Sequence, residues 1–291
     1  MPQFVKDAVN AIANPITFTI FAWALIIGAI VFYRWWTKPK IFWTLFGLII
    51  LFGMLSFPDP NFNKIVTKPD NVPIAGMLLL CIFFVWLSLR QAAINDERLE
   101  KGLPPFEAEE SDRVLVWPDL VFIELIAMVV STLILVLWSV FISAPLEEPA
   151  NPTRTPNPSK APWYFLGLQE MLVYFDPWIA GVVLPGLIIT GLILIPYCDR
   201  NPRGNGYYTL KERPFAIGVF LFGFLGLWVS LIILGTFLRG PNWNFFGPYE
   251  PWDVHKTPVL NNVDLSQYFW IKWMGQPMPE TILQREAPGI V

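Results

Sequence analysis

Six long apolar stretches, separated by polar and proline-rich segments, dominate the chain. Crossing the hydrocarbon core of a membrane takes about 20 mostly apolar residues in helical form. The stretches are residues 16–33, 41–57, 73–89, 120–144, 178–197 and 215–238. None of them alternates polar and apolar positions, which is the pattern of a transmembrane barrel strand. The sequence therefore predicts an all-α integral membrane protein with six transmembrane helices.

Lysine and arginine are concentrated in alternate loops between these stretches. The loops after the first, third and fifth stretches contain Arg34, Lys38 and Lys40; Arg90, Arg98, Lys101 and Arg113; and Arg200, Arg203, Lys211 and Arg213. Cytoplasmic loops of membrane proteins carry such an excess of basic residues. We therefore expect both termini on the outer, positive side and a multi-pass location in a bacterial inner membrane.

Composition also divides the chain into segments. Residues 91–119 are polar and contain eight acidic side chains. This acidic connector separates an N-terminal three-helix block, residues 1–90, from a second three-helix block, residues 120–240. An aromatic-rich tail, residues 241–291, follows the last span and is expected on the outer face.

Charge, cysteine and histidine content exclude several kinds of function. Only 15% of the 291 residues are charged, against roughly a quarter in soluble domains. The net charge of −3, without a basic run, gives no reason to expect a nucleic-acid partner. Cys81, Cys198 and His255 are the only cysteines and histidine. They cannot supply the ligands of two b haems, a c haem, an iron–sulfur cluster or a zinc site, so we predict no metal site on this chain.

An ordered set of short motifs runs through the second block. The motifs are Val116-Trp117-Pro118-Asp119-Leu120, the proline-rich loop 144–152, Lys160-Ala161-Pro162-Trp163-Tyr164-Phe165, Leu184-Pro185-Gly186, Ile195-Pro196-Tyr197 and Arg213-Pro214. In order and spacing this set resembles the C-terminal half of cytochrome b, which is a separate subunit, subunit IV, in cytochrome b6f-type complexes. The resemblance covers roughly residues 111–240 and leaves the N-terminal three-helix block as an addition.

The resemblance implies a quinol oxidation site on the outer face. In the family, a Pro-Glu-Trp-Tyr motif forms part of that site, and its tyrosine lines the pocket. The corresponding quinol-binding candidates here are Pro162, Trp163, Tyr164, Phe165 and Gln169.

The motif lacks its glutamate in this chain, because Pro162 stands at that position and Ala161 precedes it. In the family the glutamate is thought to take a proton from the quinol, and quinol oxidation needs such an acceptor. Glu170, about two helical turns beyond Trp163, is the nearest carboxylate and the tentative catalytic residue. Two alternatives stay open: Glu170 lies on a solvated helix face, or the partner subunit supplies the base.

Two further charged residues are candidates for an inner-side role. Glu124 lies one turn into the fourth stretch, where a carboxylate is costly and is often functional. It either takes up protons at an inner quinone site or extends to the interface. Arg213 either anchors its loop to lipid headgroups or faces an inner quinone or lipid pocket.

The resemblance implies a haem-free membrane subunit of a quinol:cytochrome c oxidoreductase in respiratory or photosynthetic electron transfer. In this sense the chain is an enzyme subunit that is not catalytic alone. The resemblance implies a haem-b-bearing partner similar to the N-terminal half of cytochrome b. It also implies a Rieske iron–sulfur protein or a (multi)haem cytochrome c, with quinol at a shared site and lipid around the helices. Two other interpretations stay open. The chain is a quinol-binding anchor of another respiratory complex, or a transporter or channel subunit, although the halves show no inverted repeat.

Overall fold

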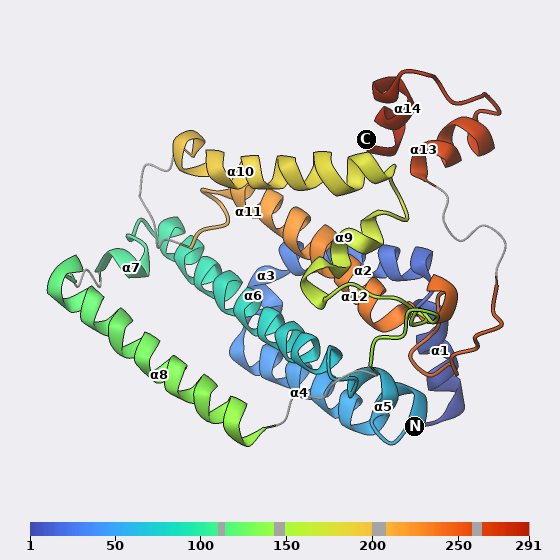
Figure 1. The fold of residues 1–291 in the computed structure, drawn as a ribbon. Coiled ribbons are helices and arrows are strands. Elements are labelled where there is room, and N and C mark those ends of the chain that lie inside the picture. The colour runs from blue at the N-terminus through green and yellow to red at the C-terminus, as the bar shows by residue number, and fades with distance from the viewer. Residues whose placement is uncertain (110–113, 143–148, 200–207, 258–263, 291) are drawn as a thin grey trace. The chain divides into compact units, whose positions relative to one another are not determined.

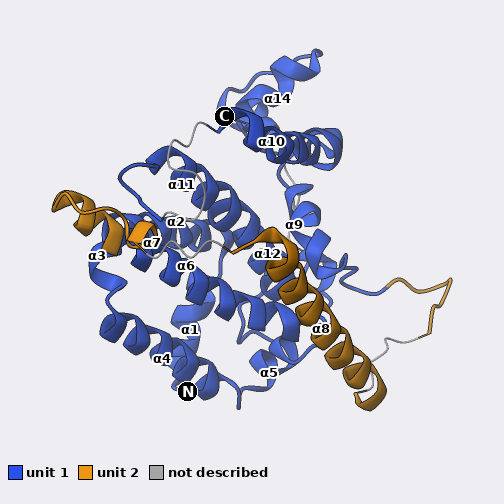
Figure 2. Ribbon diagram, turned by 90° about the vertical axis from the view of Figure 1, so that its left-hand side faces the viewer, with its two compact units in different colours: residues 1–93, 156–291 blue, residues 94–155 orange. Residues whose placement is uncertain are grey.

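The protein is described by a computed structural model that covers residues 1–109, 114–142, 149–199, 208–257 and 264–290. These residues form two compact units, Met1–Ala93 with Pro156–Val291, and Ile94–Thr155 (Figure 2). All regular structure in the described ranges is helical, apart from one isolated bridge between Arg239 and Phe245 (Figure 1). The predicted all-α fold is confirmed.

Five helical segments of the described chain are long and apolar enough to cross a membrane: Pro39–Ser56, Asn71–Glu100, Val116–Phe141, Ile179–Cys198 and Pro214–Leu238. A sixth candidate is the pair Gln3–Ile12 and Pro15–Val31, which is bent by 86°. These segments correspond to the six apolar stretches of the sequence. The side of the membrane on which the termini lie stays a prediction.

The N-terminal part of the first unit contains helices α1 to α6. Their bounds are Gln3–Ile12, Pro15–Val31, Tyr33–Trp36, Pro39–Ser56, Pro60–Val66 and Asn71–Glu100, the last running past Ala93. Two helix starts are specified by a cap followed by proline. The side chain of Asn14 accepts from the amide of Ile16, and that of Asp59 accepts from two amides at the start of α5. Such oxygens accept hydrogen bonds from amides that have no partner within the helix. Proline suits the first helical position because it has no amide hydrogen that needs an acceptor.

Aromatic stacking joins α4 to α6. The rings of Phe42 and Trp86 lie parallel with centroids 4.1 Å apart, and Phe42 is almost fully buried. The indole of Trp86 donates to the carbonyl of Thr37, at 2.8 Å. Buried tryptophan needs such a partner, so this bond allows the ring to serve as a packing centre.

The C-terminal part of the first unit contains the last two spans and the tail. Its helices are α9 (Trp163–Met171), η2 (Ile179–Val183), α10 (Leu184–Cys198), α11 (Pro214–Phe220), η3 (Leu221–Val229), α12 (Ser230–Ile233), η4 (Leu234–Leu238), η5 (Pro241–Trp243), α13 (Leu265–Gln267), η6 (Tyr268–Trp273) and α14 (Ile282–Ile290). The segments from α11 to η4 form one continuous span, Pro214–Leu238.

The N-terminal block packs directly on this last span. The ring of Trp23 in α2 lies 5.1 Å from that of Phe222 in η3, centroid to centroid. A side chain at Gly226 would come within 2.6 Å of the Trp23 ring, so only glycine allows this approach. The added N-terminal helices are therefore an integral part of the membrane unit.

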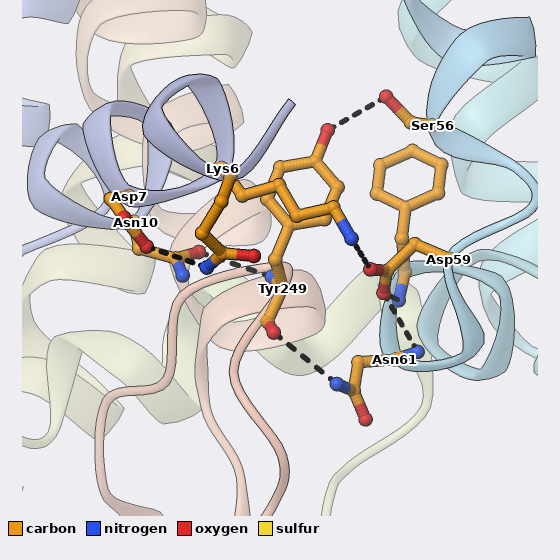
Figure 3. Close-up of polar contacts among 9 residues, drawn as sticks. Lys6, Asp7, Asn10, Ser56, Asp59, Asn61 and Tyr249 are labelled. Atoms are coloured by element: carbon orange, nitrogen blue, oxygen red, sulfur yellow. Dashed lines mark hydrogen bonds and ion pairs between the residues drawn. The ribbon is translucent and has the colours of Figure 1, made fainter. Parts of the chain in front are cut away.

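A polar cluster ties α1 and α5 to the tail residue Tyr249 (Figure 3). Lys6 forms an ion pair with Asp59 at 2.5 Å, and the hydroxyl of Tyr249 lies 2.7 Å from that of Ser56. The amide of Tyr249 donates to the side chain of Asn10 at 3.1 Å. The two bonds of Tyr249 connect positions 193 and 239 apart in the chain, so they hold the tail against the N-terminal block.

The second unit contains the end of α6 and helices α7 (Phe106–Glu109), η1 (Val116–Leu120) and α8 (Val121–Phe141). Here α6 continues as a helix to Glu100, into the segment expected to be a connector. Asn95 accepts from the amide of Phe106 and donates to the carboxylate of Glu107, which fixes the turn after α6. The residues of α8 are exposed almost throughout.

Candidate functional site

The short helix α9 carries most of the predicted quinol-binding residues. It begins after Pro162, lies between two candidate spans in the sequence, and packs on α12 and η4 (Figure 1). Its buried positions are Leu166, Gly167, Glu170 and Met171, which recur at the spacing of one helix face. The helix is therefore held by one face, and within the described ranges the opposite face is partly to fully exposed.

The first turn of α9 carries three consecutive exposed aromatic side chains. Tyr164 is 51% exposed, and Trp163 and Phe165 are exposed as well. The ring of Tyr164 lies 5.7 Å from that of Trp163 and 4.8 Å from that of Phe165. Such an apolar patch with a phenol at its centre is typical of a surface that binds a ring-shaped ligand or a partner protein.

Close helix packing positions this turn. A side chain at Gly235 in η4 would come within 3.1 Å of Leu166, and one at Gly167 within 3.4 Å of Ile232 in α12. Small residues in membrane helices permit such close backbone approach. The position of the aromatic turn is thus set by the last span.

The side chain of Gln169 closes the preceding loop onto α9. Its carbonyl oxygen accepts from the amide of Ala161 at 2.7 Å, and its amide nitrogen donates to the carbonyl of Ser159 at 3.0 Å. Gln169 therefore orients Pro162 at the start of α9. Its assignment as a direct quinol ligand stays a prediction.

Glu170 lies in a buried ion pair with Arg239. The exposed fractions of the two side chains are 0% and 1%. The guanidinium donates from Nε to both carboxylate oxygens, at 3.1 and 3.0 Å, and from Nη2 to Oε1 at 2.6 Å. The hydroxyl of Tyr174 donates to Oε1 at 3.0 Å. The alternative that Glu170 faces solvent is therefore wrong.

The remaining side of Arg239 is also satisfied. Its Nη1 donates to the carbonyl of Trp243 at 2.7 Å, and the guanidinium lies 3.7 Å from the centre of the Phe245 ring. Burial raises the pKa of Tyr174, and the nearby charge of Glu170 raises it further. Glu170 as the proton acceptor stays a prediction. In that role it has to take a proton while its carboxylate is held by Arg239.

Lys160 is a candidate that sequence reasoning missed. Its Nζ donates to the carbonyl of Thr236 at 2.8 Å and lies 5.6 Å from the centre of the Trp252 ring. Burial, together with the positive charges of Lys68 and Arg239, lowers the pKa of Lys160 to about 7, against an opposing effect of Glu170. The sequence contains no signal for this, because the groups that surround the amine come from distant segments.

Replacing Lys160 with Met should therefore stabilise the protein, most strongly near or below pH 7. The unfolded chain binds the lysine proton up to about pH 10.5, whereas the folded chain releases it near pH 7. The free energy of unfolding of the parent consequently rises with pH between these values. In Lys160→Met this contribution to the pH dependence is absent. Thermal unfolding midpoints from pH 6.5 to 9.5 measure the difference.

The matched control is Lys160→Arg, which keeps a positive charge at every pH of the series. This variant should be destabilised relative to the parent, with the difference growing toward high pH. An identical pH slope in the parent and in Lys160→Met would contradict the lowered pKa.

The two inner-side candidates belong to different units. Glu124 is exposed in the first turn of α8, in the second unit. Arg213 precedes α11 in the first unit, where its Nη2 pairs with Asp199 at 2.5 Å. Arg213 also lines a cavity of about 590 Å³. In the described part of the chain, no group of three or more His, Cys, Asp or Glu side chains is arranged to hold a metal ion.

Comparison with protein families supports the resemblance seen in the sequence. Residues 149–247 match the family model described as cytochrome b (C-terminal)/b6/petD. The match includes α9, the last two spans and Arg239, and it begins after α8. The motif around Trp117 lies outside it.

Two curated relatives are similar over about a third of the chain. The menaquinol:cytochrome c reductase cytochrome c subunit of Geobacillus thermodenitrificans is 33% identical over 110 residues, which are 36% of this chain and 42% of the relative. Cytochrome b of Allochromatium vinosum is 32% identical over 96 residues, or 31% of this chain and 23% of the relative. The chain thus spans less than half the length of these relatives. No solved structure matches it significantly.

Proposed function

We propose that this chain, whose residues 149–247 form a C-terminal cytochrome b segment, is a membrane subunit of a quinol:cytochrome c oxidoreductase. The observation that carries the proposal is the free aromatic turn Trp163-Tyr164-Phe165 at the start of α9, inside that segment. A flat quinol ring fits against such a turn, and a partner subunit would close the other side of the site.

The partners of the complex would supply the electron carriers. We expect a haem-b-bearing subunit, together with a Rieske iron–sulfur protein or a haem c subunit. The name of the Geobacillus relative, a menaquinol:cytochrome c reductase subunit, supports this reaction class. The apolar spans support a multi-pass place in a bacterial inner membrane, with the α9 site on its outer face.

Quinol oxidation releases two electrons to the partners and two protons to acceptors at the site. In the proposed site, Tyr164 contacts the quinol ring and Gln169 keeps Pro162 and the loop in position. Glu170 is the proton acceptor within this chain, and a base on the partner is the alternative. On the inner side, Glu124 is proposed to take up protons, and Arg213 is proposed to face a pocket for a quinone or a lipid.

Isolation of the native complex tests the proposal directly. The mildly solubilised complex should show b-haem absorption and quinol-dependent reduction of cytochrome c. The separated chain should carry no haem, because a single histidine and two separated cysteines supply no ligand set. A haem stain that migrates with this chain under denaturing conditions would contradict the haem-free assignment, and a complex without haem would contradict the function.

A second candidate function is a quinol-binding anchor of another respiratory complex. The observation that favours it is Pro162, which has neither a proton acceptor nor an amide donor where the family has its glutamate. In that case the purified complex binds quinol at α9 but transfers its electrons to an acceptor other than cytochrome c.

A further inference from the structure

A cavity of about 590 Å³ lies between α6 and the start of the last span, within the first unit. Its volume is in the range of small-molecule sites. The apolar walls include Leu80 and Phe84 of α6, and Phe220, Leu221 and Phe224 of α11 and η3. A smaller cavity of about 180 Å³ between α2, α6 and η3 shares wall residues with it, so the apolar space continues toward α2.

One end of the cavity is polar and coincides with the ends of two spans. Asp199 directly follows Cys198, where one candidate span ends, and Arg213 directly precedes Pro214, where the last span begins. Ser88 and the buried Thr209 lie on the same lining. The site thus has a charged end at the depth of lipid headgroups and apolar walls at the depth of acyl chains.

Among the described residues, Asp199 is the one hydrogen-bond partner of the Arg213 side chain. Its contact with Asp199 uses Nη2, and no acceptor for Nε or Nη1 is found among the described residues. Guanidinium groups bind phosphate oxygens through two parallel N–H groups. Asp199, which is partly exposed, balances the positive charge of Arg213. Its carboxylate oxygens can also accept hydrogen bonds from a positively charged group of a ligand.

We infer that this cavity binds a zwitterionic aminophospholipid. Its phosphate would accept hydrogen bonds from Arg213, and its headgroup amine would donate to Asp199. One acyl chain would lie along Phe84, Phe220 and Phe224. A headgroup with one negative and one positive group complements the ion pair, whereas an anionic headgroup leaves Asp199 facing like charge. The lipid would fill the gap between the added N-terminal block and the cytochrome b segment.

Lipid analysis of the purified complex tests this inference. After detergent washing that removes bulk lipid, the parental complex should retain at least one phosphatidylethanolamine per copy of the chain, measured by extraction and native mass spectrometry. Arg213→Gln should lower retention at least about tenfold, since it removes a charge-assisted contact. Ala216→Trp, which fills the cavity and keeps both charges, should lower it as well.

The control variant is Lys211→Gln, which removes a positive charge two residues from Arg213 but outside the cavity lining, and should retain the lipid. Equal retention in Arg213→Gln and the parent overturns the site. Selective retention of phosphatidylglycerol would contradict the zwitterionic headgroup. If the parental complex instead retains a quinone, and Arg213→Gln loses it, the cavity binds a quinone and not a lipid. Haem content and quinol oxidation, measured on the same samples, report separately on the proposed function.

Discussion

Replacing Arg239 with Met should lower the free energy of unfolding of the α9 region by about 3–5 kcal/mol. The substitution leaves the carboxylate of Glu170 buried, at 0% exposure, without its cationic partner. An uncompensated buried charge costs about this much, even though the intact pair contributes little compared with apolar packing. Hydrogen exchange of the α9 amides and the thermal midpoint of the complex measure the loss.

The double variant Glu170→Leu/Arg239→Met is the matched control. Removing both charges leaves no unpaired ion, so most of the lost stability should return. The two sites are coupled through direct hydrogen bonds, and their effects should therefore be far from additive. Additive losses in the double variant would show that the ion pair does not hold α9 to the last span.

The same double variant decides the role of Glu170 as a proton acceptor. If Glu170 takes the quinol proton, turnover should fall by at least about tenfold even where stability has recovered, as we also expect for Glu170→Gln. Parental turnover in a stable double variant would assign Glu170 to structure alone and place the base elsewhere.

Replacing Tyr164 with Ala should reduce quinol-dependent reduction of the acceptor by at least about tenfold while the complex still assembles. Tyr164 is half exposed, and its ring meets that of Trp163 edge to face and that of Phe165 at a tilt. Its removal should therefore cost little folding energy, whereas a displaced ring at the reaction site costs up to about 10²-fold in rate. Steady-state turnover and subunit content of the purified complex are the measurements.

Two further variants control for loss of an aromatic side chain. Tyr164→Phe keeps the aromatic ring and removes only the hydroxyl, so it distinguishes the contribution of ring packing from that of the hydroxyl. Tyr268→Ala removes a tyrosine of similar exposure from η6 in the tail, outside the proposed site, and should leave turnover unchanged. If Tyr164→Ala assembles and reaches parental turnover, α9 does not form the quinol site.

The apolar runs of the sequence were sufficient to predict the all-α membrane fold. A helix satisfies its own backbone hydrogen bonds, so a run of about 20 apolar residues specifies a span without information from the rest of the chain. A local signal also identified the aromatic turn, because Trp163-Tyr164 carried the family resemblance that the match to residues 149–247 supports. The helix cap at Asn14 was found in the structure.

Only the tertiary structure decided how the candidate site is held together. Glu170 and Arg239 are separated by 69 positions, and the sequence contains no signal that pairs them. The packing of Trp23 against Gly226 and the burial of Lys160 near Thr236 likewise join segments that are remote in the chain. Span formation depends on local composition, whereas ion pairing and amine desolvation depend on which side chains meet after the helices pack. The sequence by itself therefore determined the helices and the aromatic turn, and tertiary packing determined which charged side chains of the site are paired and which are removed from solvent.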